Sequence, residues 1–238
     1  EMGRACLPAP FFSTVVLGHL SILDIGSEEQ KERYLSEIVS GKAIFSLALI
    51  DPGLGYEPKA ITSEATPDGD AYVIKGTKLF IPYANVADYL LCVARTSESE
   101  EGITIFVVDA KSPGVKCTVL DTMAHEKLCE VVFDRVRVPK ENILGQLDQG
   151  WSEVQKIVER SDAAKCCELA GNFQWVLEDT ITYAKDRKQF DRPIGSFQVM
   201  QHYCADIATY VEGARLSAYQ AAWMVSENLP CAKEIAVA

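Results

Sequence analysis

The stretch YAKDRKQFDRPIGSFQ, from Tyr183 to Gln198, joins two long segments with helical periodicity. Around its proline and glycine stand Arg187, Gln189, Phe190 and Gln198. A solvent-facing connector has no packing reason to carry an aromatic ring and a guanidinium at set places. The alternative is an ordinary helical connection with a basic cap, because the helix dipole favours cations near a helix C-terminus. The flanking sequence has to decide between the two interpretations.

Helical periodicity extends to both sides of this stretch, over 151–187 and 197–228. Both segments are longer than a usual globular helix, so we expect them to pack as antiparallel neighbours in a bundle. The sequence from 151 to 238 is therefore predicted to be a C-terminal helical bundle domain, and an incomplete one.

Upstream of the helices, the residue pattern of 43–150 predicts a middle β domain. Turn signals such as Asp68-Gly69-Asp70 separate short runs of high β propensity. The predicted strands are 43–50, 71–75, 78–81, 89–95, 103–109, 115–120 and 130–138. Their spacing predicts a mainly antiparallel barrel or sandwich.

Residues 1–42 are predicted to be the end of an N-terminal helical domain. From Ser13 to about Gly41 the pattern is helical, and Ser27 and Gln30 have the spacing of a capping box. The predicted fold class is thus α+β and multidomain, with a helical piece, a β domain and a helical bundle in that order.

Composition narrows the functional classes. The chain has 238 residues, 48% hydrophobic and 24% charged, and a formal net charge of −11. That charge argues against a general nucleic-acid or anionic-membrane binder, which would need a basic patch. No run approaches the ~18 apolar residues of a membrane span, and no signal-peptide pattern opens the chain, so a cytoplasmic location is expected. The eight cysteines form no C-x-x-C pair or zinc cluster, which favours reduced, mostly buried thiols and no metal.

Five motifs in order give a more specific indication. They are GSEEQ at 26–30, ALIDPGLGYE at 48–57, GTKLFIP at 76–82, VRVPKENILG at 136–145 and the R-x-QF…FQ pattern of the opening stretch. Together they resemble the acyl-CoA dehydrogenase family over nearly the whole chain. Because family members continue beyond both ends, the resemblance implies an internal fragment.

The resemblance implies an FAD enzyme that oxidises acyl-CoA thioesters. A carboxylate would take the α-proton while the β-hydride passes to flavin N5, and the protein would position the thioester and tune the base. In the family the base stands on a late C-terminal loop or at a helix position that matches Ser161. Serine cannot be that base, so the base is expected beyond Ala238 and no catalytic residue is assigned here.

The same helical turn is where the family binds substrate. The matching positions are Glu159, Arg160, Ser161 and Asp162, with Tyr56 added from the upstream loop. Asp162 stands where the family commonly has a cation, and Arg160 is adjacent to a matched position. Glu159 also fits a plain solvated helix face. The resemblance therefore leaves open whether CoA is held differently or weakly.

The flavin-contacting segments depart from the family pattern as well. Ile50, Tyr56 and Pro82 replace a family hydroxyl, serine and threonine, and Pro82 also lacks a backbone N–H. Phe80 replaces a tryptophan and keeps an aromatic surface. Backbone donors of the 51–55 turn survive side-chain changes, and glycines there permit close approach. The predicted flavin contacts in these segments are Leu49, Ile50, Asp51, Gly55, Tyr56, Phe80, Ile81 and Pro82.

The opening stretch matches the family segment that reaches the adenosine-diphosphate part of FAD in a neighbouring subunit. Arg187, Gln189, Phe190 and Gln198 would supply it, since a guanidinium suits a pyrophosphate. Core packing under the turn remains the alternative for Phe190. A shared site implies a homo-oligomer, or a hetero-oligomer with a paralogue, and the family implies an electron-transferring flavoprotein as acceptor.

Two hypotheses remain. In the first, the chain is the central part of a working acyl-CoA dehydrogenase whose base lies outside it. In the second, it is a degenerate, noncatalytic partner subunit of a hetero-oligomer, as the substitutions at Ile50, Pro82 and Asp162 favour. Acyl-chain specificity lies beyond what these residues specify.

Overall fold

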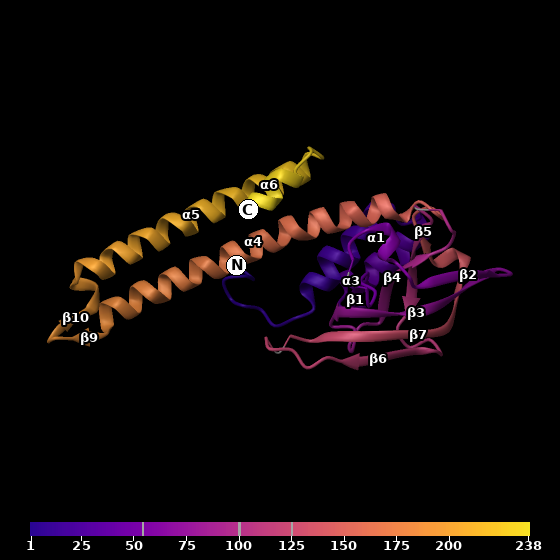
Figure 1. Ribbon diagram of the computed structural model, residues 1–238, viewed down its shortest axis with the longest axis horizontal. Coiled ribbons are helices and arrows are strands. Elements are labelled where there is room, and N and C mark those ends of the chain that lie inside the picture. The colour runs from indigo at the N-terminus through magenta and orange to yellow at the C-terminus, as the bar shows by residue number, and fades with distance from the viewer. Residues whose placement is uncertain (54, 100, 125) are drawn as a thin grey trace. The chain divides into compact units, whose positions relative to one another are not determined.

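A computed structural model describes residues 1–53, 55–99, 101–124 and 126–238 (Figure 1). The chain forms two compact units, one of Ala9–Ile157 and one that combines Glu1–Pro8 with Val158–Ala238. Each unit is described on its own below. The first holds short helices and a sheet and the second is helical, which confirms the predicted mixed α+β class. The three-domain division at 42 and 150 stays a prediction.

One eight-stranded sheet organises the first unit. Its path runs β6-β7-β3-β2-β4-β5-β8, and β1 pairs with β4 off that path. Most pairs are antiparallel, as predicted, whereas β1–β4 and β2–β4 are parallel. The strands are β1 Phe45–Ala48, β2 Glu64–Asp68, β3 Ala71–Pro82, β4 Tyr89–Arg95, β5 Ile103–Asp109, β6 Val115–Val119, β7 Leu128–Pro139 and β8 Ile143–Leu144. Along the described strands the path is open, ending at β6 and β8, so the sheet does not close into a barrel.

Strand bounds agree with the sequence where β propensity is high. The predicted bounds of β4 and β5 are those observed. The predicted strands 71–75 and 78–81 are one strand, β3, which continues through Gly76 with shifts of register. β2 was not predicted, because its sequence EATPD has low β propensity and its pairing with β3 comes from the turn at Gly69.

The core of this unit lies where the sheet folds over on itself. Tyr72 on β3 and Phe106 on β5 are not on neighbouring strands, yet their ring centroids are 5.4 Å apart. Alternating residues of β3, β4, β5 and β7 fill the space between them. The sheet thus supplies both walls of its own core.

The N-terminal helices of this unit break where the capping box lies. The first helical stretch ends at Gly26 and consists of a π-helical part, Phe12–His19, and α1, Leu20–Ile25. The second begins with α2, Glu28–Gln30, and continues through π-helical Lys31–Leu35 into α3, Ser36–Val39. Ser27 and Gln30 make both capping-box hydrogen bonds, which confirms that prediction. The Gln30 amide also donates to the carbonyls of Glu141 and Ile143, each at 2.8 Å. One side chain therefore caps a helix and ties it to the segment that enters β8.

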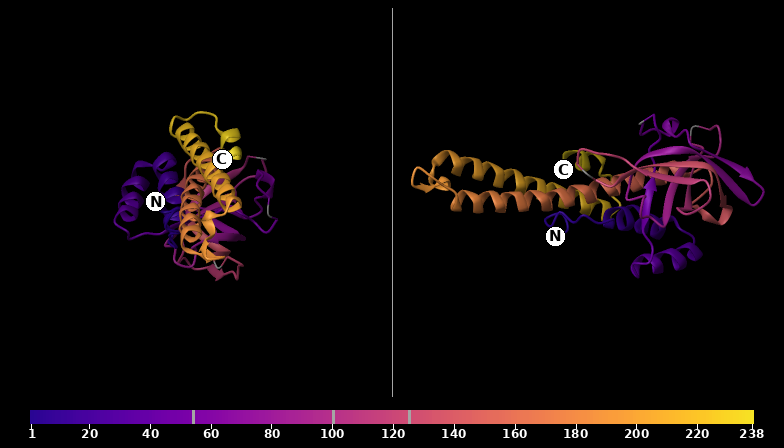
Figure 2. Two further views of the ribbon diagram at one scale, coloured as in Figure 1. Left: turned by 90° about the vertical axis from the view of Figure 1, so that its left-hand side faces the viewer. Right: turned by 90° about the horizontal axis from the view of Figure 1, so that it is seen from below.

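The second unit is dominated by two long antiparallel helices (Figures 1 and 2). They are α4, Gly150–Asp186, whose first turns belong to the first unit, and α5, Gln198–Ser226; α6, Ala232–Val237, follows. These bounds lie within two residues of those predicted. The N-terminal segment lies against α4, since a Cβ added to Gly171 would come 2.8 Å from the backbone nitrogen of Arg4. Arg4 also forms an ion pair with Glu178.

The structure can be compared with two further predictions, the lack of a membrane span and the burial of the cysteines. Over the described ranges, no helix is both long and apolar enough to cross a membrane. All eight cysteines are free thiols, but only Cys92, Cys129 and Cys231 are buried. The expectation of mostly buried thiols was therefore wrong, because five of them lie on helix surfaces, on the edge strand β6 and near the N-terminus.

Candidate functional site

The first predicted flavin segment, Leu49–Asp51, leaves β1 and attaches at once to β3. The backbone N–H of Leu79 donates to the Ile50 carbonyl at 2.8 Å, and Lys78 Nζ donates to the Leu49 carbonyl at 3.0 Å. Buried backbone carbonyls need partners of this kind once a strand has ended. The two carbonyls therefore point inward, and the backbone of this segment is fixed beside residues 78–79.

A buried ion pair lies directly beneath the segment. Lys78 Nζ is 2.6 Å from Asp51 Oδ2, and the two side chains are 0% and 1% exposed. The other Asp51 oxygen accepts a short hydrogen bond from the Ser63 hydroxyl. Since its carboxylate is fully engaged inside the protein, Asp51 can face a ligand only with its backbone.

The remainder of this loop is held from its far end by Arg95. The Arg95 guanidinium donates to the carbonyls of Pro58 and Ile61, at 2.6 and 3.2 Å. Gly55 lies so close to Ala60 that an added Cβ would come within 2.4 Å of the Ala60 Cβ. Tyr56, between these anchors, is 69% exposed. Its hydroxyl is thus carried at the surface by a loop whose two ends are fixed.

The second predicted flavin segment is the end of β3. Phe80 has φ +56°, a left-handed conformation that is unusual for a bulky residue, and its ring is 42% exposed. Ile81 is buried opposite Cys129 of β7, so only its backbone can meet a ligand. The Pro82 carbonyl accepts a hydrogen bond from the Ser46 hydroxyl at 2.6 Å. The structure thus brings 49–51 and 78–82 together, with the Phe80 ring at the surface.

The predicted substrate residues occupy one turn of α4. Glu159 and Asp162 are exposed, and Arg160 is half-buried. The Ser161 hydroxyl donates to the carbonyl of Val158 at 2.8 Å, within its own helix. Partial desolvation raises the pKa of the Asp162 carboxyl above the ordinary aspartate value.

The hairpin between α4 and α5 holds the last predicted group. β9, Lys188–Gln189, pairs with β10, Arg192–Pro193, through a tight turn at Phe190 and Asp191, whose φ angles are +54° and +61°. The Phe190 ring is 85% exposed and meets Phe197 edge-on at 6.1 Å. Core packing of Phe190 is thus excluded by its exposure. Arg187 and Gln198, also exposed, mark the end of α4 and the first residue of α5.

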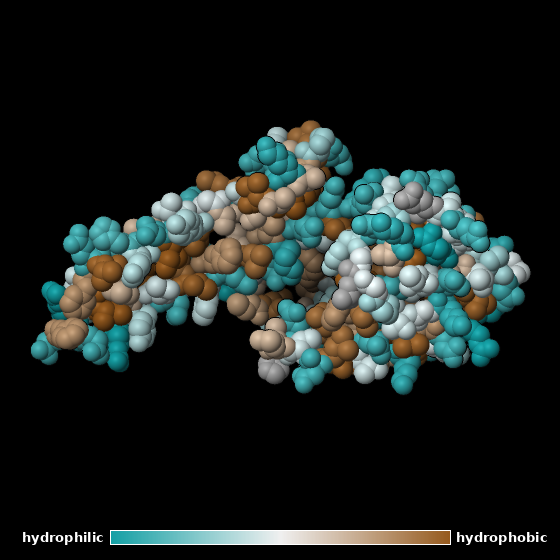
Figure 3. Space-filling model, in the orientation of Figure 1, coloured by the Kyte–Doolittle hydropathy of each residue, from teal (hydrophilic) through white to brown (hydrophobic). Residues whose placement is uncertain are grey.

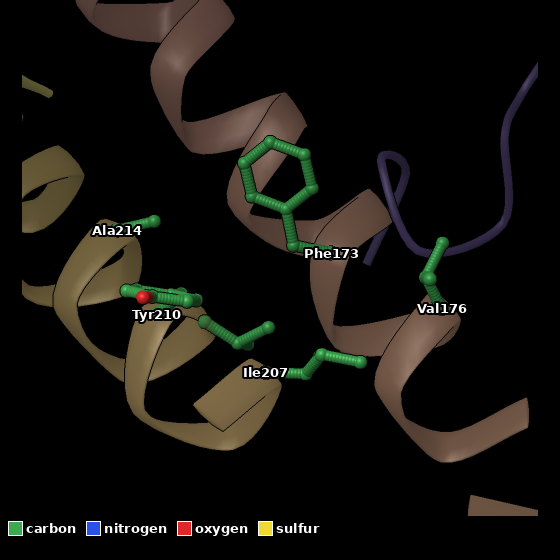
Figure 4. A pocket seen from close by; sticks show the side chains of 6 residues that line it. Phe173, Val176, Ile207, Tyr210 and Ala214 are labelled. Carbon is green, nitrogen blue, oxygen red and sulfur yellow. The ribbon is translucent and has the colours of Figure 1, made fainter. Parts of the chain in front are cut away.

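Hydrophobic side chains are exposed along α4 and α5 (Figure 3). A hollow of about 330 Å³ lies between the two helices. Phe173 and Val176 face Ile207, Tyr210 and Ala214 across it (Figure 4), and Val211 completes the lining. Among these side chains only Tyr210 carries a hydrogen-bonding group, so the hollow has little with which to orient a polar substrate.

Sequence reasoning missed the residues that anchor these segments. Lys78 was noted as part of a motif but received no role, and Ser63, Ser46 and Arg95 were not singled out. The available signal was Lys78 itself, because the other residues of the predicted strand 78–81 are all apolar. Arg192 was also missed; its guanidinium carbon lies 4.1 Å from the centre of the Phe197 ring.

Comparisons with known proteins agree with the motif order. Residues 46–136 match the family model "Acyl-CoA dehydrogenase, middle domain", and residues 148–238 match "Acyl-CoA dehydrogenase, C-terminal domain". The chain belongs to the acyl-CoA dehydrogenase family. Members of this family are FAD-dependent oxidoreductases, and the resemblance predicted from the five motifs is confirmed.

Individual acyl-CoA dehydrogenase relatives are similar over most of the chain. The caffeyl-CoA reductase-Etf complex subunit CarC of Acetobacterium woodii is 35% identical over 90% of this chain and 58% of its own length. A 3-(aryl)acrylate reductase of Clostridium sporogenes is 32% identical over the same shares. Butyryl-CoA dehydrogenase from Megasphaera elsdenii has a solved structure that matches with a TM-score of 0.92 and 28% identity, over 99% of this chain and 62% of that one. The chain thus spans about three fifths of these relatives.

The residues present fit parts of the FAD that acyl-CoA dehydrogenases bind. Phe80 offers an exposed aromatic face, and the fixed 49–51 backbone lies beside it. Arg187 offers a guanidinium suited to a pyrophosphate. Ile50 and Pro82 offer no side-chain donor. The set is therefore adequate for the aromatic and phosphate parts of the cofactor and poorer for the polar edge of its ring.

Proposed function

We propose that this chain is part of an FAD-dependent acyl-CoA dehydrogenase that acts on the Cα–Cβ bond of an acyl-CoA thioester. The observation that supports it best is the attachment of the Leu49–Asp51 backbone to Lys78 and Leu79, next to the exposed Phe80 ring. Two segments far apart in sequence, both expected to contact flavin, are held together by bonds that leave the ring outside.

The chemistry divides between cofactor and chain. When bound, FAD would supply the two-electron acceptor for the β-hydride. The chain's own residues would present a fixed backbone and an aromatic surface from the first unit, and an exposed guanidinium from the second. The α-proton requires a base, and the proposal places that carboxylate in sequence beyond Ala238. Ser161 is unsuited, because a hydroxyl is a poor base and this one is already bonded to Val158.

Several finer elements belong to the same proposal. Glu159, Arg160, Asp162 and Tyr56 are proposed to contact the acyl-CoA, and Arg187, Gln189, Phe190 and Gln198 the adenosine-diphosphate part of FAD in a second subunit. The 85% exposure of Phe190 supports this role, because an aromatic ring at a surface turn offers apolar area to a second subunit. An oligomer, an electron-transferring flavoprotein as acceptor and a cytoplasmic location remain predictions.

The alternative is a noncatalytic partner subunit. The absence of side-chain donors at Ile50 and Pro82, and a carboxylate at Asp162 where the family commonly has a cation, favour it. Such a subunit would keep the fold and its interface but would not be reduced by any thioester. The two proposals therefore differ in one measurable property, the reduction of bound flavin.

The test is the visible absorbance of the protein purified without added flavin, followed by anaerobic titration with saturated acyl-CoAs of several classes. Because two relatives are named as reductases, the reverse titration of chemically reduced protein with aryl-acrylyl-CoAs belongs to the same experiment. Bleaching or recovery of the flavin bands supports the enzyme. Protein that binds no flavin, or bound flavin that no thioester changes, contradicts the enzyme and supports the noncatalytic partner subunit.

A matched pair of variants tests the guanidinium. Arg187→Gln is expected to weaken FAD binding at least tenfold, because it removes a charge-assisted contact to phosphate. Lys188→Gln removes the same charge one residue away and is expected to leave FAD affinity within twofold. Equal losses in both variants would reduce the role of Arg187 to general electrostatics.

A further inference from the structure

The buried pair of Lys78 and Asp51 presents an energetic question. Taking two charges out of water is costly, and apolar residues of similar volume often replace a buried ion pair without loss of stability. The two side chains are nevertheless 0% and 1% exposed. Thermodynamic stability alone is therefore a weak reason for this pair, and its geometry offers a better one.

The contacts of the pair all converge on the Leu49–Asp51 turn. Lys78 donates both to the Asp51 carboxylate and to the Leu49 carbonyl, at 2.6 and 3.0 Å. An apolar side chain at 78 could make neither bond. The next residue, Leu79, donates its backbone N–H to the Ile50 carbonyl at 2.8 Å. Three consecutive residues of the turn are thus bonded to two consecutive residues of β3.

The third member, Ser63, joins the network through a close approach to Gly76. A Cβ added to Gly76 would lie 2.2 Å from the Ser63 hydroxyl oxygen, closer than real Cβ atoms come. Only glycine at 76 leaves room for Ser63 to reach the second oxygen of Asp51. Gly76 and Lys78, two residues apart on one strand, therefore serve the same carboxylate.

We infer that Lys78, Asp51 and Ser63 are positioning residues that fix the Leu49–Asp51 backbone in one register against the Phe80 end of β3. The inference rests on the proposed flavin role of these segments. None of the three side chains meets the cofactor; each acts through the backbone of the residues that would. The network explains how the turn keeps its shape although Ile50 and Pro82 carry no polar side chain.

The first experiment needs no cofactor. Amide hydrogen exchange of the 76–82 segment is compared in the wild-type chain and the Lys78→Met variant. The Leu79 amide is expected to exchange at least tenfold faster in the variant, because its acceptor, the Ile50 carbonyl, is no longer held. Ile105→Val, in the buried part of β5, is the control for a general loss of stability. Equal acceleration of all β3 amides, or none at Leu79, would overturn the inference.

The second experiment separates position from charge. In Lys78→Met combined with Asp51→Leu no buried charge is left unpaired, so thermal stability is expected to recover relative to Lys78→Met alone. Flavin affinity is expected to stay at least tenfold below wild type, with an altered flavin absorbance spectrum, because the bond to Leu49 is still missing. A double variant with wild-type affinity and spectrum would refute the positioning role. Failure of wild-type protein to bind flavin would instead refute the proposed function, while the exchange result would stand.

Discussion

The two regions expected to contact flavin are built in opposite ways. The turn at 49–51 and the end of β3 rest on buried polar groups, and most of their side chains point inward or are already engaged. The hairpin at 187–198 is held by a two-residue turn and by contacts of Phe190 and Arg192 with the Phe197 ring, and its side chains are mostly exposed. In the first region backbone placement carries the function; in the second the side chains themselves have to. Substitutions of the buried groups should therefore change both stability and backbone placement, whereas substitutions in the hairpin should change binding with little effect on stability.

The largest expected effect is in the sheet core. Phe106→Ala removes a fully buried ring that meets Tyr72 and is expected to cost about 3–5 kcal/mol of unfolding free energy. Urea unfolding measures it, with Phe106→Leu as a milder control. A loss below about 1 kcal/mol would mean that the sheet does not pack over its core as described.

The core also predicts a dependence of stability on alkaline pH. Burial raises the pKa of the Cys92 thiol from 9.0 to about 12. Below pH 9 this thiol is protonated in both states and contributes no pH dependence. Between pH 9 and 12 the unfolded thiol ionises while the folded one stays protonated, so stability falls, by about 4 kcal/mol at most.

The measurement is the difference in unfolding free energy between wild type and Cys92→Ala from pH 7 to 12. The difference should be constant up to pH 9, and above pH 9 the wild type should lose stability relative to the variant. A difference that stays flat through pH 12 would contradict the burial of this thiol.

A smaller effect is expected where a helix joins the sheet. Gln30→Ala removes the acceptor for the Ser27 N–H and two donations to the carbonyls of Glu141 and Ile143. The expected cost is about 1–3 kcal/mol, measured by urea unfolding. Glu32→Ala, exposed and two residues away, serves as the control and should stay within about 0.5 kcal/mol of wild type. Equal unfolding free energies for the two variants would show that Gln30 does not tie the helix to the sheet.

The smallest effect on stability is expected in the hairpin. Phe190→Gly removes a side chain from a position with positive φ, where glycine is not strained. It should raise the unfolding free energy by no more than about 1 kcal/mol. Asp191→Gly, with the same sign of φ, is the matched control. Thermal unfolding compares them, and FAD affinity should fall only for Phe190→Gly. Equal affinities would show that the exposed ring has no part in binding.

The sequence predicted structure best where residues only a few positions apart determine the local conformation. The capping box at Ser27 and Gln30, the bounds of β4 and β5, and the two long helices were predicted because each depends on residues a few positions apart. β2 was missed because its strand state comes from β3 beside it. The predicted separation of strands 71–75 and 78–81 was wrong, since pairing with β7 carries β3 through Gly76.

The sequence by itself determined the order of elements, the family and the identity of the residues expected to contact a cofactor, because these depend on motifs and short-range periodicity. Tertiary structure alone decided which of those residues face outward. Asp51 and Ile81 turn inward, while Phe80 and Phe190 are exposed in left-handed conformations. It also assigned a role to Lys78, since its partners Asp51 and Leu49 stand 27 and 29 positions away. Long-range pairing of buried charges leaves no periodic trace, and so only the folded chain specifies it.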